Sequence, residues 1–253
     1  MNEANQITQV TKLYGFIAEE AQQNRFAVTL NKRFKASGDD AMMIPMNIRP
    51  DDFYFTLSNM KQSHVNGAVI ATEYQDQVLE IADTASPLCE RTGICDTVVA
   101  ENGQMHGELL LPFALKEMAE KSGVKRIALI GATPLAGALA LILENMSVAM
   151  FDPWIEDLMA LQERLGAELD INRLAEGMRV DLSGYDMLID LSGIQDLSMV
   201  TALPALNVDL KQPRQPSALR RRCVELDRSY SGYESLLDIM TETVYNYLTK
   251  ETR

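Results

Sequence analysis

Short apolar runs alternate with segments of helical periodicity along most of the chain. A continuous apolar run is typical of a strand buried on both faces of a sheet, whereas apolar positions three and four residues apart are typical of a helix. For the first half, this pattern predicts strands at residues 13–17, 42–48 and 67–72, and helices at residues 26–35, 51–62, 76–82 and 108–120. Asn102-Gly103 predicts a hairpin between residues 95–101 and 104–107.

Residues 125–152 have the pattern of a dinucleotide site, with a strand at 126–130, a glycine turn, a helix at 135–144 and a second strand that ends at Asp152. The fingerprint G-x-G-x-x-G reads here Gly131-Ala132-Thr133-Pro134-Leu135-Ala136. Alanine is accepted at its third glycine position. The fingerprint is nevertheless altered, because Thr133 adds a side chain where the backbone approaches phosphates and Pro134 has no N–H to donate.

The predicted cofactor-binding residues are those of this turn, the acidic strand end and one later glycine: Gly131, Ala132, Thr133, Leu135, Asp152 and Gly193. A carboxylate about 20 residues after the first glycine accepts a hydrogen bond from a ribose 2′-hydroxyl and repels a 2′-phosphate. If a dinucleotide binds, we therefore expect NAD rather than NADP.

The rest of the chain continues the alternation. We predict a helix at residues 155–165, strands near 187–191 and 206–210, a proline-rich loop at 204–216 and a long amphipathic helix at 233–248. The expected fold class is α/β, with an N-terminal α/β substrate-type domain and a Rossmann-like, doubly wound parallel sheet. The expected domains are residues 1–107, to which the helix at 233–253 returns, and residues 108–232.

The order of small landmarks resembles the shikimate dehydrogenase family over nearly the whole chain. Tyr14-Gly15-Phe16-Ile17 is similar to its opening strand, and Gly67-Ala68-Val69 to the start of its G-x-N-V-T-x-P-x-K strand. Further landmarks follow in the family's order: Asn31, Phe34, Gly93, Thr97, Asn102, Gly103, Gly107, Gly232, Leu236 and Leu237. This resemblance implies a substrate domain and an NADP-binding domain.

The resemblance also implies that the family's chemical groups are replaced. Gln75 stands for its catalytic lysine, and Leu111 stands for the partner aspartate. The carboxylate-binding serines become Asn24 and Phe26, while the asparagines at the substrate's ring hydroxyls become Val69 and Asp96. A positioned acid or base contributes typically about 10²- to 10⁴-fold to rate. We therefore expect a catalytically silent module that binds a ligand or a protein partner, with no catalytic residue of the usual kind.

The alternative is an active NAD(P)-dependent oxidoreductase that acts on a different small hydroxy or keto substrate. Its rebuilt acid and base would come from Tyr74, Glu73, Asp96 and Glu108. Equally open are structural roles, in which Glu73 caps a helix, Tyr74 packs in the core and Glu108 favours a helix start. A stand-alone nucleotide sensor that uses only the second domain is a third interpretation.

A ligand pocket is expected between the two domains, at the strand ends where open α/β sheets bind ligands. The expected lining residues are Tyr14, Asn31, Val69, Thr72, Tyr74, Asp96 and Leu111. Phe26 and Val69 would make it drier than a shikimate site, and Glu73 and Asp96 would repel a carboxylate. We expect a neutral or cationic ligand, or none.

The composition of the chain argues against several classes of binding partner. A net charge of −13 argues against nucleic-acid binding and against anionic membranes, and Arg220-Arg221-Arg222 is the one basic cluster. The uncharged run at 127–143 is interrupted by Gly131, Pro134 and Gly137, so a membrane span is not expected. The first twenty residues have no apolar core typical of a secretory signal, which predicts a cytoplasmic protein.

The chain has three cysteines, Cys89, Cys95 and Cys223, and their spacing does not match a disulfide framework. Together with His106 they do not match a zinc pattern either, so no metal is expected.

Overall fold

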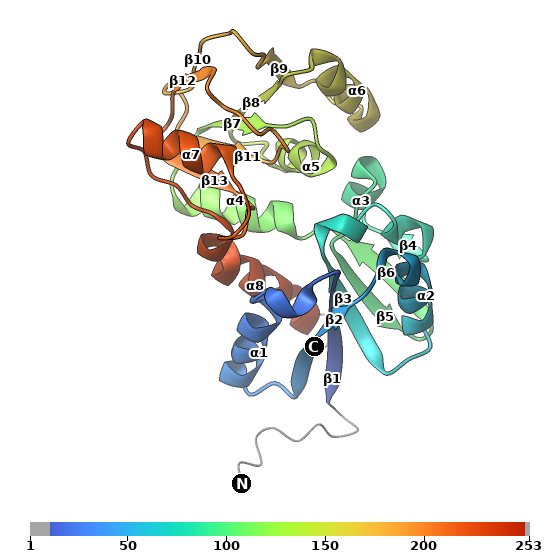
Figure 1. Ribbon diagram of the computed structural model, residues 1–253. Coiled ribbons are helices and arrows are strands. Elements are labelled where there is room, and N and C mark those ends of the chain that lie inside the picture. The colour runs from blue at the N-terminus through green and yellow to red at the C-terminus, as the bar shows by residue number, and fades with distance from the viewer. Residues whose placement is uncertain (1–10, 251–253) are drawn as a thin grey trace. The chain divides into compact units, whose positions relative to one another are not determined.

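The computed structural model describes residues 11–250 and divides into two compact units (Figure 1). The first unit contains the residues up to Leu111 and those from Met240 onward, and the second is Pro112–Ile239. The expectation of no secretory signal in the first twenty residues concerns in part residues 1–10, which lie outside the described residues.

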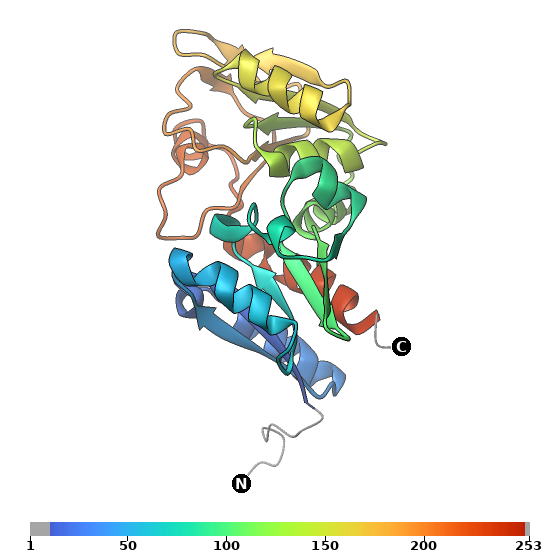
Figure 2. The same cartoon turned by 90° about the vertical axis from the view of Figure 1, so that its right-hand side faces the viewer.

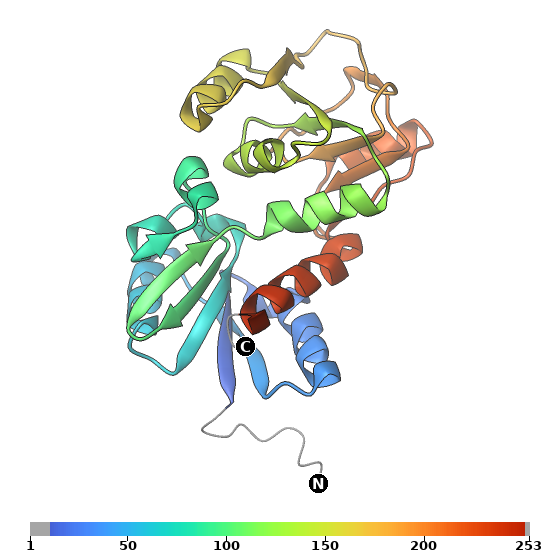
Figure 3. The same ribbon diagram turned by 180° about the vertical axis from the view of Figure 1, so that it is seen from behind.

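The first unit is built on a six-stranded sheet of order β2-β1-β3-β5-β6-β4. Its strands are β1 Lys12–Ala18, β2 Ala41–Asn47, β3 Val65–Ile70, β4 Thr84–Ala85, β5 Thr97–Glu101 and β6 Gln104–Glu108. β1 pairs in parallel with β2 and β3, and β5 and β6 form the predicted antiparallel hairpin. The helices are α1 Phe26–Ser37, α2 Pro50–Met60 and α3 Pro87–Thr92, with the 3₁₀ turn η2 at Ala21–Gln23. Figure 2 shows α2 on one face of this sheet, and Figure 3 shows α1 on the other.

The helix predicted at residues 76–82 is wrong. The 3₁₀ turn η4 Val78–Glu80 occupies this segment, and another 3₁₀ turn, η3 Thr72–Tyr74, precedes it. Asp83 ends it at the sheet, because its N–H donates to Met105 O at 2.8 Å and its Oδ2 accepts from Met105 N at 2.7 Å. These two bonds direct the chain into the short strand β4 before an α-helix is complete.

The second unit contains a fully parallel sheet of order β13-β11-β7-β8-β9. Its strands are β7 Arg126–Ile130, β8 Ser147–Asp152, β9 Asp170–Arg173, β11 Met187–Asp190 and β13 Leu206–Asp209, and a separate pair is β10 Val180–Asp181 with β12 Val200–Ala202. The helices are α4 Leu111–Lys121, which begins at the unit boundary, α5 Pro134–Ile142, α6 Ile155–Leu165 and α7 Ala218–Glu225. This arrangement confirms the predicted α/β, Rossmann-like fold class.

The uncharged run at residues 127–143 divides between β7, the glycine turn and α5. Within residues 11–250, no helix combines the length and the apolar character that crossing a membrane requires.

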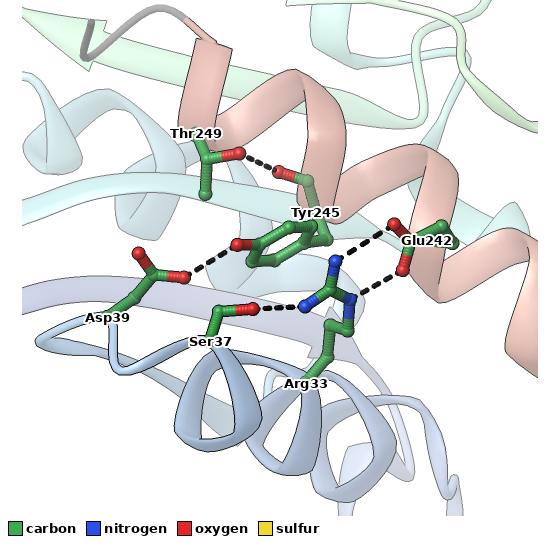
Figure 4. A network of polar contacts seen from close by, with 6 residues as sticks. All are labelled: Arg33, Ser37, Asp39, Glu242, Tyr245 and Thr249. Carbon is green, nitrogen blue, oxygen red and sulfur yellow. Dashed lines mark hydrogen bonds and ion pairs between the residues drawn. The ribbon is translucent and has the colours of Figure 1, made fainter.

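The last helix, α8 Tyr233–Lys250, begins in the second unit and continues into the first, where it lies against α1 (Figures 3 and 4). Arg33 of α1 holds it through a forked ion pair, with Nε 2.6 Å from Glu242 Oε2 and Nη2 3.1 Å from Oε1. The same guanidinium lies 3.8 Å from the ring centroid of Tyr245, and the Tyr245 hydroxyl donates to Asp39 at 2.8 Å. Ser37 accepts a further bond from Arg33. One arginine thus joins α1 to the returning helix.

Arg33→Ala is expected to lower the midpoint of thermal unfolding by a few degrees and to speed hydrogen exchange in the part of α8 after Met240. The variant removes both the forked ion pair and the cation–π contact. Lys32→Ala, a neighbouring exposed position on α1, is the control and should leave both measurements unchanged. Equal exchange of α8 in both variants would contradict the role assigned to Arg33.

Candidate functional site

The glycine turn after β7 lies against the turn after β11. Gly131 has a φ of +117°, and a Cβ on it would lie 3.0 Å from Ser192 N and 3.1 Å from the carbonyl carbon of Leu191. Only glycine fits such a backbone and such a gap. β7 also lies between β8 and β11, where the strand order reverses. In open α/β sheets, this is the position at which ligands bind.

The N-terminus of α5 retains donors for an anion in spite of its altered fingerprint. Thr133 is the N-cap residue, and its Oγ1 accepts from Ala136 N at 3.2 Å, so the added side chain turns back onto its own helix. Among the described residues, the backbone N–H groups of Thr133 and Leu135 have no hydrogen-bond partner. Two free amides and the positive end of the helix dipole favour a phosphate here.

Asp152 lies beside this turn, as its spacing predicts. Its Oδ2 accepts from Ala132 N at 2.9 Å and its Oδ1 accepts from Trp154 N at 3.0 Å, and the residue is only 8% exposed. The carboxylate therefore braces the glycine turn to the segment that follows β8. Each oxygen keeps a lone pair that a ribose hydroxyl can use.

A second acidic strand end, Asp190 of β11, was not among the predicted site residues. Its Oδ1 accepts from Ser192 N at 3.0 Å and from Ser192 Oγ at 2.6 Å, and Oδ2 has no hydrogen-bond partner among the described residues. Burial raises the pKa of Asp190 to about 6, with a smaller contribution from Asp209 on the adjacent strand. Gly193, predicted to bind cofactor, follows in the exposed loop. The sequence signal that could have identified Asp190 is its position directly after the apolar run Met-Leu-Ile, at the end of a strand, as Asp152 lies at the end of β8.

In the first unit, Asp96 holds the start of α4. Its carboxylate accepts from Leu110 N at 2.9 and 3.0 Å, from Leu111 N at 2.7 Å and from Thr97 Oγ1 at 2.9 Å. Burial raises its pKa to about 6, although these donors act in the opposite direction. The cap also corrects the predicted start of this helix at Glu108, because α4 begins at Leu111 and Glu108 belongs to β6.

The residue expected at the family's lysine position is part of the interior. Gln75 is 6% exposed, and its Nε2 donates to Ile70 O at 3.0 Å. The Tyr74 hydroxyl donates to Ile48 O at 2.5 Å, and its ring stacks on Phe53 with centroids 4.5 Å apart. Burial raises the pKa of Tyr74. Both side chains satisfy backbone carbonyl groups.

The two glutamates of the alternative acid–base set also have internal partners. Glu73 Oε1 accepts from Glu19 N at 3.0 Å, so it holds the chain after β1 instead of capping a helix. Glu108 Oε1 accepts from Leu109 N at 3.0 Å. Each of the four alternative catalytic residues, Tyr74, Glu73, Asp96 and Glu108, therefore has at least one hydrogen bond within the first unit.

The other expected pocket residues all belong to the first unit. The Asn31 amide bonds both backbone groups of Met43, at 2.7 and 2.8 Å. Tyr14 and Val69 are buried on the adjacent strands β1 and β3, Leu111 is half-buried and Thr72 is exposed. The inter-domain pocket itself stays a prediction.

The residues expected at the serine positions of the family also have structural roles. Asn24 Oδ1 accepts from Phe26 N at 2.8 Å. Phe26 is 2% exposed and stacks on Phe16 with centroids 5.6 Å apart. This pair therefore belongs to the core and to the turn that begins α1.

Metal ligation has no support in residues 11–250, where no three His, Cys, Asp or Glu side chains group around one point. Cys89, Cys95 and Cys223 are free and buried. The hydrogen bond between Cys95 and Cys89, together with burial, raises the pKa of Cys95. His106 Nδ1 pairs with Thr84 Oγ1 at 2.9 Å.

No protein-family model matches the chain. The shikimate dehydrogenase (NADP(+)) of Thermococcus kodakarensis is 25% identical over 232 residues, which cover 90% of this chain and 80% of that relative. The enzyme of the same name from Moorella thermoacetica is 22% identical, with 75% and 68% covered.

Solved structures with the same fold include a shikimate dehydrogenase in complex with NADP+, with a TM-score of 0.78 and 18% identity over 99% of this chain and 94% of that chain. The shikimate 5-dehydrogenase of Listeria monocytogenes, in complex with shikimate and NAD, has a TM-score of 0.77 and 16% identity, with 97% and 94% covered. The resemblance inferred from sequence landmarks is confirmed: the chain is similar to shikimate dehydrogenases in sequence over most of its length, and it shares their fold.

Proposed function

We propose that this protein binds a nicotinamide dinucleotide, NAD(H) in preference to NADP(H), and does not oxidise shikimate. The observation that carries the second part is that Gln75, at the lysine position, is buried and donates its amide to Ile70 O. A primary amide neither accepts nor releases a proton near neutral pH, so it cannot serve the reacting hydroxyl as acid or base.

The neighbouring groups support the same proposal. Asp96 accepts four hydrogen bonds at the start of α4, and Tyr74 donates its only hydroxyl proton to Ile48 O. Recruiting either residue for proton transfer would leave a buried backbone group unpaired, at a cost of about 1–3 kcal/mol for each group. A silent binding module is therefore better supported than an oxidoreductase with a rebuilt acid and base.

The purified protein is expected to show no appreciable oxidation of shikimate with either NAD or NADP. Loss of the lysine and its partner removes roughly 10²- to 10⁴-fold from a median turnover of about 10 s⁻¹. The measurement is NAD(P)H absorbance at saturating substrate, with a shikimate dehydrogenase assayed in parallel as the positive control. Turnover within about tenfold of that median would refute the proposal.

The double variant Gln75→Lys with Leu111→Asp tests whether restoring the family's lysine and aspartate restores shikimate oxidation. We expect no recovery of full activity, because Phe26 and Val69 still present apolar side chains where the family binds a carboxylate and a hydroxyl. The single Gln75→Lys variant is the matched control for stability, since the lysine would lose the bond to Ile70 O. Full activity of the double variant would show that the two positions alone had silenced the site.

The cofactor preference follows from Asp152. A carboxylate accepts from a ribose 2′-hydroxyl but repels the 2′-phosphate of NADP, although the relatives named above are NADP(+) enzymes. Calorimetry is expected to give tighter binding for NAD(H), and Asp152→Arg should reverse the order. Asp157→Arg is the control, because it makes the same charge change on the exposed first turn of α6. This variant should still bind NAD(H) more tightly than NADP(H). Tighter binding of NADP(H) by the unaltered protein would contradict this preference.

Besides the dinucleotide, we propose that the protein binds a neutral or cationic small molecule in place of shikimate. The polar residues expected at the family's substrate-binding positions include no cation that would attract a carboxylate. A thermal-shift panel of matched amines, polyols and carboxylic acids, with NAD present, distinguishes the classes. Tight binding of a small hydroxy acid would exclude this ligand class.

A further inference from the structure

Trp154, the chain's only tryptophan, is 63% exposed at the ligand edge of the second sheet. It is the N-cap residue of α6 and comes two positions after Asp152, where β8 ends. A large indole in water forgoes the free energy that its burial would give, so its exposure at this edge calls for a ligand-based explanation.

Hydrogen bonds fix the backbone of this tryptophan relative to the glycine turn. Trp154 N donates to Asp152 Oδ1 at 3.0 Å, and Asp152 Oδ2 accepts from Ala132 N at 2.9 Å. β8 and β7 are adjacent parallel strands, with Phe151 opposite Ile130. The indole therefore follows the acidic strand end on the β8 side of the turn, whereas Ser192 contacts the turn from the β11 side.

We propose that Trp154 is a stacking platform for the purine base of the bound nucleotide. The order of groups along this edge matches one end of such a molecule: free amides at Thr133 and Leu135 for phosphate, the Asp152 carboxylate for ribose hydroxyls, and then the aromatic face for the base. Any base can stack on an aromatic side chain, because every base has a flat π-face whatever polar atoms lie along its edge. The platform thus contributes affinity, and Asp152 contributes the discrimination between a hydroxyl and a phosphate.

A nucleotide fits this position better than a second copy of the chain does. Glu156 and Asp157 follow Trp154 in the first turn of α6, so a symmetric contact between two copies at Trp154 would bring the carboxylates of both copies together. The free amides beside it instead suit an anionic group attached to a flat ring.

Tryptophan fluorescence, excited where tyrosine absorbs little, tests the inference directly, because Trp154 is the chain's only tryptophan. AMP and NAD are expected to quench it, and nicotinamide mononucleotide, which lacks the purine, is not. By calorimetry, Trp154→Ala should weaken AMP and NAD binding about tenfold or more, whereas Trp154→Phe should lose less because it keeps an aromatic face. Met159→Ala, an exposed apolar position on the same helix, is the control and should bind like the unaltered protein.

This inference rests on the proposed binding of a dinucleotide, and the outcomes separate the two. If calorimetry detects no binding of NAD or NADP, both ideas fail. If NAD binds but leaves the fluorescence unchanged, and Trp154→Ala binds it normally, only the stacking role of Trp154 is overturned. Quenching by AMP with a matching loss of affinity in Trp154→Ala supports both.

Discussion

Asp96→Ala is expected to lower the free energy of unfolding of the first unit by about 3–5 kcal/mol. Asp96 is 5% exposed, and its carboxylate is the hydrogen-bond acceptor for the backbone N–H groups of Leu110 and Leu111. Alanine leaves these donors unpaired at the start of α4, and this cost outweighs the gain from removing a buried carboxylate whose pKa is raised to about 6 by burial.

The measurement is urea unfolding followed by circular dichroism, with Asp96→Asn as the matched variant. Asparagine keeps one oxygen for the Leu110 and Leu111 N–H groups, and its amide can donate to Thr97 Oγ1, so it should cost no more than about half as much as alanine. A small and equal effect of both substitutions would show that Asp96 is not the cap of α4. The comparison is made at pH 7.5, where the carboxylate is charged.

Asp190→Asn is expected to stabilise the second unit at pH 7.5, by about 1–3 kcal/mol, and to flatten its dependence on pH. Burial raises the pKa of Asp190 to about 6 in the folded protein, above the value near 3.9 of an unfolded chain. The folded state therefore binds this proton more tightly. Its contribution is fully favourable below about pH 4 and is lost as the pH rises through about 6.

Asparagine removes the buried charge and keeps an oxygen for Ser192 N and Oγ, so the gain should be largest above pH 6 and absent near pH 4. Thermal unfolding between pH 4 and 8 measures it. Asp196→Asn is the control, because hydrogen bonds from Ser198 lower the pKa of that carboxyl and its substitution should not stabilise the protein. Unchanged stability of Asp190→Asn across this range would show that the Asp190 carboxylate is not costly when charged.

The sequence predicted the centre of the second sheet accurately because its signals are local, although its edge strand β9 Asp170–Arg173 was not predicted. The run Arg126–Ile130 is a buried strand that ends at a glycine, and Ile155–Leu165 is an amphipathic helix that ends at Gly166, with a φ of +56°. Both bounds were predicted without error. The segment at 76–82 failed because its end is set by Met105, which lies 22 residues from Asp83 and belongs to another strand.

The site was only partly predictable for the same reason. Fingerprint spacing identified Gly131 and Asp152, but the bond from Ala132 N to the Asp152 carboxylate depends on the pairing of β7 with β8, 20 residues apart. The spacing of Asp96 to Leu110 and Leu111 is likewise set by the intervening hairpin, so its capping role was not visible. Trp154 was missed because pattern analysis assigns a tryptophan to the core unless exposure is known.

The clamp between Arg33 and Glu242 has a consequence for biosynthesis, because 209 positions separate the two residues. At roughly 5–20 residues per second, a ribosome needs roughly 10–40 s to travel between them. During that interval, the second unit, contiguous from Pro112 to Ile239, is synthesised in full. The first unit still lacks α8, whose Tyr245 packs on Phe34. The N-terminal half of this protein is therefore the last part to be completed, and until then its apolar α1 face depends on the nascent chain's surroundings for protection.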